Sequence, residues 1–235
     1  MTIVEPKPGP DKIRLLRDCL IFRSLDEAAR QELAARAYFK RYAAKEPIFQ
    51  MGSPGQSMMA IAAGVVRITA PMESGREIIL ADLPAGEVFG EVAMLDGKER
   101  SAAATALTNC ELLVLERRDV VALIRHDADA ALRLLELLCA RLRRSEERMT
   151  EIAFLEVPAR LARTLIRAAA DAAERSRVQP VKLSLAQGEL ARMIGSSREN
   201  VNRCLKEWQR HGLIDLKDGW LIVLDPQGLE AHANR

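Results

Sequence analysis

The sequence is poor in the features that mark secreted, membrane-spanning and disulfide-bonded proteins. Its four cysteines, Cys19, Cys110, Cys139 and Cys204, lie far apart in the chain, which excludes a C-x-x-C motif and offers no disulfide framework. No run of about 18 apolar residues occurs, and the first residues lack the apolar stretch of a secretory signal. We therefore expect a soluble, cytoplasmic protein with no membrane partner.

Patterns that carry catalysis or hold metal are missing as well. The chain has no metal-ligand cluster, no Walker loop and no nucleophile placed beside a base. An enzyme, such as a phosphodiesterase or a kinase, would have no visible catalytic residues here. We therefore expect neither a catalytic activity nor a bound metal.

Charge is distributed unevenly along the 235 residues, a length that suits one large domain or two small ones. Residues 1–157 hold 22 Lys and Arg against 24 Asp and Glu, a net charge of −2. Residues 158–235 hold 13 against 9, a net charge of +4. The basic C-terminal third suggests an anionic partner, although ordinary surface variation would explain the charge alone equally well.

Turn residues punctuate the chain between Pro47 and Leu115 at intervals of roughly ten residues, with strand-like runs between them. This spacing predicts an antiparallel β-sandwich or barrel. The preceding segment LDEAARQELAARAYF reads as an amphipathic helix that starts near Leu25-Asp26. The glycines among the turn residues are Gly52, Gly55, Gly64, Gly75, Gly86 and Gly97.

A long helical segment, residues 127–154, carries a heptad pattern that predicts a coiled coil with a second copy of the chain. Packing of this helix on its own sheet is the alternative. Ser145 is a polar residue within the apolar seam. The apolar seam positions are Ala128, Ala131, Leu135, Leu138, Leu142, Met149 and Ile152.

The C-terminal third contains a helix-turn-helix pattern. After Val157-Pro158, where a new helix can begin, AQGELARMI is followed by Gly195 and by a second helix that starts at Ser196-Ser197. On the second helix Val201, Leu205 and Trp208 share one face and should lie in a core. DLKDGWLIVLD then reads as a β-hairpin that turns at Asp218-Gly219, a wing beside the two helices.

The polar face of that second helix has the side chains that read base edges. Arg pairs with guanine, Glu accepts from cytosine and Asn can pair with adenine, whereas hydroxyls at a helix start can cap it and reach phosphates. A solvated helix face would explain any one of these charges, but not their collection at the N-terminal end. The predicted DNA-binding residues are Gln187, Ser196, Ser197, Arg198, Glu199, Asn202, Arg203 and Lys206.

The segment FGEVAMLDGKERSAA, residues 89–103, holds the elements of an anion site. If EVAML forms a helical turn, its start offers free N–H groups, and Gly90 lets a ligand approach the backbone. Arg100 and Ser101 can bind a phosphate, and Glu91 can accept from a neighbouring sugar hydroxyl. The local pattern leaves a second interpretation open, a surface ion pair between Glu91 and Arg100.

Several motifs together resemble the Crp/Fnr superfamily of bacterial transcription regulators, and within it the cAMP receptor protein branch. They are the glycine-punctuated strands, F-G-E-V-A-M-L-D-G-x-x-R-S-A at 89–102, IAFLEV at 152–157 and GSSRENVNR at 195–203. The resemblance implies an α+β chain with a cyclic-nucleotide-binding β-roll over residues 1–126, a dimerisation helix and hinge over 127–156, and a winged helix-turn-helix over 157–235. It also implies a homodimer that binds double-stranded DNA at palindromic TGTGA-like half-sites, and RNA polymerase if it activates.

The resemblance further implies the ligand contacts. Gly90 and Glu91 would meet the ribose, and Arg100, Ser101 and the Ala102 amide the cyclic phosphate. Val92 is a further expected ligand-binding residue. The base would be read by Ser145, with Glu146 supplied by the partner subunit. These are the expected binding residues for cAMP as an allosteric effector without a metal.

Three departures from the family pattern affect the expected ligand and DNA contacts. The base-reading pair is Ser-Glu rather than two hydroxyl residues, and a carboxylate at 146 could also accept from guanine, which keeps cGMP open. Ala186 stands where a Thr usually caps the first helix of the helix-turn-helix, so we expect Ser184 with Gln187 to cap one turn earlier. Asn202 replaces a residue that is often small, which affects the spacer preference.

Other effectors of the superfamily fit less well. An iron–sulfur sensor needs a cysteine cluster, whereas only Cys19 lies near the N-terminus. A haem sensor needs axial ligands, and His126 is far in sequence from the ligand segment. An effector-independent regulator with a vestigial pocket is the alternative to a cyclic-nucleotide-responsive one.

Overall fold

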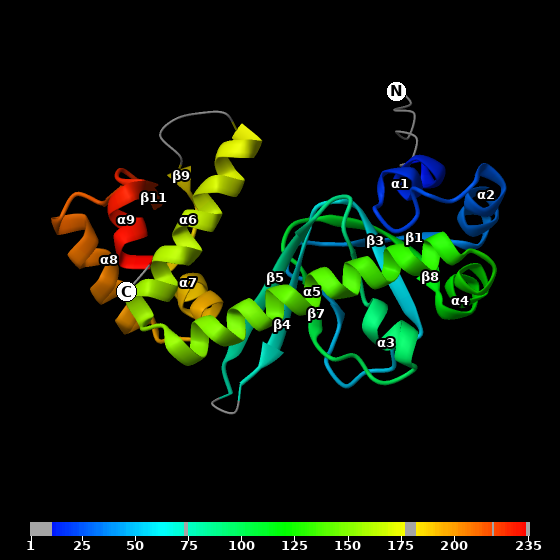
Figure 1. The fold of residues 1–235 in the computed structure, drawn as a ribbon, viewed down its shortest axis with the longest axis horizontal. Helices are drawn as coiled ribbons and strands as arrows, with labels where there is room; N and C mark the ends of the chain where they lie inside the picture. Colours follow the sequence, from blue (N-terminus) through cyan, green and yellow to red (C-terminus); the bar gives the residue numbers. More distant parts are fainter. Residues whose placement is uncertain (1–10, 73–74, 177–181, 218, 234–235) are drawn as a thin grey trace, which may run out of the picture. The chain divides into compact units, whose positions relative to one another are not determined.

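The computed structural model describes residues 11–72, 75–176, 182–217 and 219–233 (Figure 1). The chain divides into two compact units, residues 1–70 with 80–141 and residues 71–79 with 142–235, here called unit 1 and unit 2. The division crosses the β4–β5 hairpin and the long helix α5. The elements up to α5 are α1 (Lys12–Asp18), α2 (Glu27–Arg36), β1 (Tyr38–Tyr42), β2 (Pro47–Phe49), β3 (Ser57–Ala63), β4 (Val65–Pro71), β5 (Glu77–Pro84), β6 (Val88–Phe89), α3 (Glu91–Asp96), β7 (Ala103–Ala106), β8 (Cys110–Glu116), α4 (Arg117–His126) and α5 (Ala128–Phe154).

The strands of unit 1 form two four-stranded sheets, in the orders β1-β8-β3-β6 and β2-β7-β4-β5. The registered pairs are antiparallel, as the turn spacing predicts. Because side chains alternate along a strand, β3 is buried on both faces. Met59 and Ile61 lie in the core between the sheets, whereas Met58 and Ala60 pack against the helices. This explains why the run MMAIAA, which follows Ser57 in β3, is apolar throughout rather than alternating.

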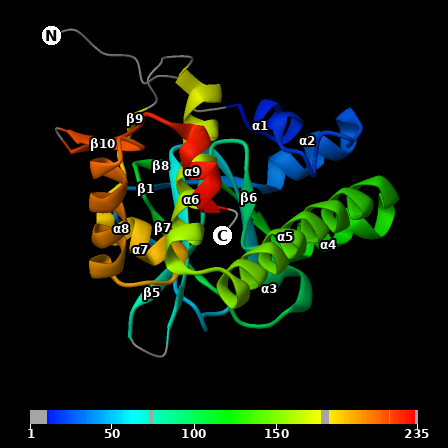
Figure 2. The same cartoon turned by 60° about the vertical axis from the view of Figure 1, so that its left-hand side comes forward.

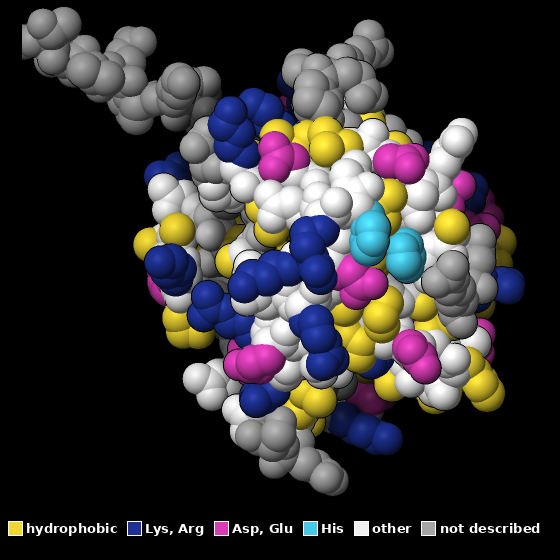
Figure 3. Space-filling view, turned by 90° about the vertical axis from the view of Figure 1, so that its left-hand side faces the viewer, with side chains coloured by type: hydrophobic (Ala, Val, Ile, Leu, Met, Phe, Trp, Pro, Cys, Tyr) yellow, Lys and Arg dark blue, Asp and Glu magenta, His cyan; other side chains and the backbone are white. Residues whose placement is uncertain are grey.

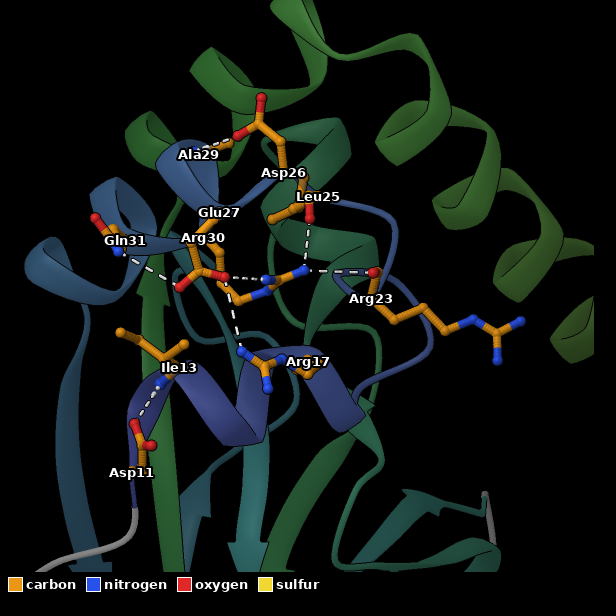
Figure 4. A network of polar contacts seen from close by, with 10 residues as sticks. All are labelled: Asp11, Ile13, Arg17, Arg23, Leu25, Asp26, Glu27, Ala29, Arg30 and Gln31. Atoms are coloured by element: carbon orange, nitrogen blue, oxygen red, sulfur yellow. Dashed lines mark hydrogen bonds and ion pairs between the residues drawn. The ribbon is translucent and has the colours of Figure 1, made fainter.

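Helices α1, α2 and α4 lie at the end of unit 1 where α5 begins (Figure 1). Figure 4 shows how α1 is tied to α2: the buried Arg30 donates to the Glu27 carboxylate at 2.8 Å and to the Leu25 carbonyl, and Arg17 forms an ion pair with Glu27 at 3.7 Å. Asp26 caps α2 by accepting from the Ala29 amide at 2.7 Å. The predicted helix start at Leu25-Asp26 is therefore confirmed.

Helix α5 has two apolar faces. Ala130, Leu134 and Leu137 are buried against unit 1. The predicted seam lies on a different face and is exposed: Leu142 is 59% and Met149 69% exposed. Packing of the helix on its own sheet therefore accounts for the inner stripe but leaves the heptad seam without a partner among the described residues.

Unit 2 holds the C-terminal helices and a small sheet in the order β10-β11-β9. Val201, Leu205 and Trp208 are buried, as the helical spacing predicts, with Leu161, Leu165 and Leu190 in the same core. Helices α6 and α9 lie side by side (Figure 2). The elements are α6 (Val157–Ser176), β9 (Lys182–Leu183), α7 (Gln187–Ile194), α8 (Arg198–Arg210), β10 (Ile214–Lys217), β11 (Trp220–Val223) and α9 (Pro226–Ala233).

Strands β10 and β11 pair antiparallel, which confirms the predicted hairpin. Gly219 has a φ of 80° at its turn, and Asp218 lies outside the described residues. The α+β class and the order of β-roll, long helix and winged helix-turn-helix are thus as the sequence predicts.

Candidate functional site

The segment between β6 and β7, residues 90–102, forms the turn and short helix at which the sequence predicts an anion site, and it is here called the cradle. Strand β6 ends at Phe89, and Gly90 then takes a φ of 80° to start α3, the predicted turn EVAML. A Cβ atom at Gly90 would lie 2.6 Å from Nη1 of Arg100. Glycine is required here for two reasons, its left-handed backbone and the close approach of the guanidinium.

Arg100 is buried without a carboxylate partner among the described residues. It is 5% exposed, and its guanidinium donates to the Gly90 carbonyl at 2.8 Å and to the Ser57 hydroxyl at 3.2 Å. It also lies over the Phe49 ring, 4.2 Å from the ring centroid. Burial lowers the pKa of Arg100, an effect that the charge of Glu91 opposes, and Nε has no hydrogen-bond partner among the described residues. The cation is therefore desolvated without a carboxylate hydrogen-bonded to it.

Glu91 is also buried, at 1% exposed, yet it does not pair with Arg100. Its Oε1 accepts from Nη1 of Arg141, whose Nη2 donates to the Val88 carbonyl. Its Oε2 is buried and has no hydrogen-bond partner within the described part of the chain. The alternative interpretation of a surface ion pair between Glu91 and Arg100 is therefore wrong.

Arg141 is the residue of this site that sequence reasoning missed. It stands on α5, fifty residues after Glu91, and continues the buried stripe of Ala130, Leu134 and Leu137 at helical spacing. A single arginine at the end of an inward apolar stripe was the available signal.

The other predicted ligand residues fall into two groups. Val92 and Ser101 are exposed at the cradle and Ala102 is half-buried. Ser145 and Glu146 are exposed on the part of α5 that belongs to unit 2. Ser145 and Glu146 thus belong to unit 2, whereas the cradle belongs to unit 1. Their role in reading a base stays a prediction.

The helix-turn-helix is formed by α7, a left-handed Gly195 with a φ of 62°, and α8. Four of the predicted DNA-binding side chains, Arg198, Glu199, Arg203 and Lys206, are exposed on α8. Figure 3 shows Lys and Arg side chains gathered in a band on the face that it presents, which is the side where α8 lies in Figure 1. The remaining ones, Gln187, Ser196, Ser197 and Asn202, are half-buried.

Asn200, which the sequence did not single out, organises the start of α8. The Ser197 hydroxyl caps the helix by accepting from the Asn200 amide at 3.2 Å. The Asn200 side chain donates to the Ser196 hydroxyl at 3.3 Å and accepts from Arg203 at 3.0 Å. The Glu199 carboxylate accepts hydrogen bonds from the Glu199 backbone amide and from the Ser197 side chain. These lower the pKa of Glu199 and so keep its side chain a hydrogen-bond acceptor.

The predicted cap of the first helix is wrong. Helix α7 starts at Gln187, so Ala186 is the N-cap, and Ser184 lies too early to cap it. Glu189 instead accepts from the Ala186 amide at 3.3 Å, which is one half of a capping box. The backbone fixes the cap position, and the hydroxyl preference does not override it.

No described helix is long and apolar enough to cross a membrane. Within the same residues, no group of three or more His, Cys, Asp or Glu side chains is placed to hold a metal ion.

Comparison with known proteins gives matches over both units. Residues 39–127 match the family model of the cyclic nucleotide-binding domain, and residues 159–232 match that of the Crp-like helix-turn-helix domain. A cyclic AMP receptor protein of Thermus thermophilus is 37% identical over 201 residues, covering 85% of this chain and 90% of that one. The cAMP-activated global transcriptional regulator Vfr of Pseudomonas aeruginosa is 29% identical, covering 82% and 92%.

Among solved structures, a c-di-GMP-responsive global regulator of Xanthomonas campestris superposes with a TM-score of 0.72 at 26% identity, covering 84% of this chain and 99% of that one. The catabolite activator protein of Thermus thermophilus superposes with a TM-score of 0.53 at 34% identity, covering 91% and 98%.

Proposed function

We propose that this protein, which belongs to the Crp/Fnr family of transcription regulators, is a cytoplasmic homodimer that binds cAMP and in response binds DNA. The expected domains are a cyclic-nucleotide domain over residues 1–126, a dimerisation helix and hinge over 127–156, and a DNA-binding domain over 157–235. The protein acts by binding rather than by catalysis.

The carrying observation is Arg100, a buried guanidinium with no carboxylate partner among the described residues. A buried charge is normally paired, because desolvation without compensation costs several kcal/mol. A phosphate is the complementary anion, and Ser101 and the Ala102 amide follow directly in the chain. The unpartnered Oε2 of Glu91 suits a ribose hydroxyl beside that phosphate.

The choice of base rests on Ser145 and Glu146. Both are exposed on α5, and we expect Ser145 to face the ligand of its own subunit and Glu146 the ligand of the partner subunit. A hydroxyl and a carboxylate can accept from the adenine amino group, and the carboxylate also from guanine N1–H and N2–H. We therefore expect cAMP as effector, with cGMP as the competing ligand.

Dimerisation is supported by the exposed apolar seam of α5, which includes Leu135, Leu142 and Met149 at heptad spacing. Leu142→Glu should give monomers in sedimentation velocity. Arg143→Glu, at the next residue and outside the seam, is the matched control and should leave the dimer intact. A dimeric Leu142→Glu variant would contradict an α5 seam.

DNA recognition is assigned to α8, whose exposed Arg198, Glu199 and Arg203 suit base edges. In a two-fold dimer the two α8 helices would read palindromic TGTGA-like half-sites about 34 Å apart. If the protein activates transcription, RNA polymerase is its further partner. Ligand controls DNA binding by favouring the DNA-competent arrangement, which requires tighter binding to that state.

The test is calorimetric titration of the full chain with cAMP and cGMP, followed by anisotropy measurements on a palindromic duplex with and without each nucleotide. c-di-GMP is a third arm, because a structural relative responds to it. cAMP should bind and raise DNA affinity, remain chemically intact, and lose its effect in Arg100→Met. Equal DNA affinity with and without every nucleotide would favour the effector-independent alternative.

A further inference from the structure

The junction between α5 and α6 has a polar contact that the effector and DNA sites do not use. Only Leu155 and Glu156 separate the two helices. No residue of α5 belongs to the described apolar core of unit 2. The last apolar residues of α5 point elsewhere: Ile152 is 51% and Phe154 is 81% exposed. Apolar packing therefore does not fix the end of α5 against α6.

Glu151 makes a polar contact that fixes the end of α5 against α6. It lies one turn before the end of α5 and is 8% exposed. Both of its oxygens accept from Arg167, with Nη1 to Oε1 at 2.7 Å and Nη2 to Oε2 at 3.2 Å. This paired arrangement is the geometry that fixes a guanidinium and a carboxylate relative to each other.

A second arginine extends the contact into the DNA-binding domain. Nη1 of Arg163, one turn before Arg167 on α6, lies 3.8 Å from Oε1 of Glu151. Nε of Arg163 donates to the Ala233 carbonyl on α9 at 3.0 Å. Glu151 is thus joined to α6 twice, and through Arg163 to the C-terminal end of α9.

We propose that Glu151 is a positioning residue that holds α6 on the last turns of α5 and so transmits the state of the dimerisation helix to the DNA-binding domain. The proposal rests on the proposed function for its regulatory meaning. The link of two residues leaves few backbone torsions to set the angle of α6, and the Glu151–Arg167 pair removes that freedom.

The test uses Glu151→Gln and Arg167→Gln in the full chain, with Glu147→Gln as the matched control. Glu147 stands one turn earlier on α5 and lines the groove that Glu151, Arg163 and Arg167 also line. It is exposed and forms no described hydrogen bond or ion pair. Amide hydrogen exchange at residues 155–160 should accelerate roughly ten-fold in Glu151→Gln. The ratio of DNA affinities with and without cAMP should fall roughly five-fold or more.

Calorimetry should show unchanged cAMP affinity in Glu151→Gln, since the residue is not in the cradle. The double variant Glu151→Gln/Arg167→Gln should lose no more stimulation than either single variant, because one pair is removed in each case. Faster exchange with unchanged stimulation would reduce Glu151 to a structural role and overturn the proposal, as would behaviour identical to Glu147→Gln.

The two proposals fail in different ways. If no nucleotide stimulates the natural protein, the proposed function fails while the positioning role can still be judged. In that case Glu151→Gln should change the affinity for the palindromic duplex relative to Glu147→Gln. Equal affinities of these two variants would then overturn the positioning role.

Discussion

Replacing Arg100 by Met distinguishes a ligand site from a structural cation. Met fills a similar volume without charge. The change removes two hydrogen bonds from a charged donor, to Gly90 and Ser57, each worth about 1.5–3 kcal/mol. It also removes a desolvation penalty of several kcal/mol for a guanidinium that is 5% exposed. Because these effects oppose each other, we expect the free energy of unfolding without ligand to change by less than about 1.5 kcal/mol.

Arg67 is the matched control, because it is a buried arginine that has a carboxylate. It is 8% exposed and donates to both oxygens of Asp82 at 2.8 Å. Arg67→Met leaves that carboxylate without its partner, and breaking a buried pair costs about 3–5 kcal/mol. The Asp82 side chain is 27% exposed, so solvent screening reduces the expected loss to about 2–3 kcal/mol.

Denaturant unfolding followed by far-UV circular dichroism measures both variants. Intrinsic fluorescence does not suit the roll, since both tryptophans, Trp208 and Trp220, lie in unit 2. At a cAMP concentration of about 100 times Kd, the free energy of unfolding of the natural protein should rise by about 2.7 kcal/mol. That of Arg100→Met should not change. A loss in Arg100→Met as large as in Arg67→Met, without ligand, would refute the reasoning and make Arg100 a structural ion.

Gly90→Ala should destabilise the roll by about 1–2 kcal/mol through its left-handed backbone and should also weaken cAMP binding, because the new Cβ would collide with Arg100. Gly86→Ala, at a φ of 92° with nothing within 4 Å, should show the backbone cost alone, and equal cAMP affinities in both would disprove the collision. A thiol reagent at pH 8 should label one cysteine per native chain, the exposed Cys139. Burial raises the pKa of Cys19 to about 12 and keeps that thiol protonated, so labelling of Cys19 at the rate of Cys139 would contradict the burial.

The sequence predicted the parts of the fold that depend on local periodicity. The turn spacing predicted the antiparallel strands, and the positions of Val201, Leu205 and Trp208 predicted the buried face of α8. These features follow from neighbours within a few residues.

The pairing of charges could not be predicted in the same way. Glu91 and Arg100 have opposite charge and lie nine residues apart, so an ion pair between them was a reasonable interpretation. In the structure Glu91 binds Arg141, which comes from a helix fifty residues later. Which arginine reaches a buried carboxylate is decided by tertiary packing, and no local spacing encodes it.

Helix α5 also explains why one polar residue was found and another missed. The outer stripe is the heptad seam, whose polar exception is Ser145. The inner stripe, Ala130, Leu134 and Leu137, ends in Arg141. Each stripe is apolar with one polar residue, and the two residues lie four apart, close to one helical turn. A search for the heptad seam tests the outer stripe only. Arg141 can be found in the same way once the face of α5 toward the sheet is considered. An arginine that continues a buried apolar stripe needs a partner for its charge. That partner is the Glu91 carboxylate, whose other oxygen has no partner among the described residues, so the helix proposed to form the dimer seam also contacts the proposed ligand site.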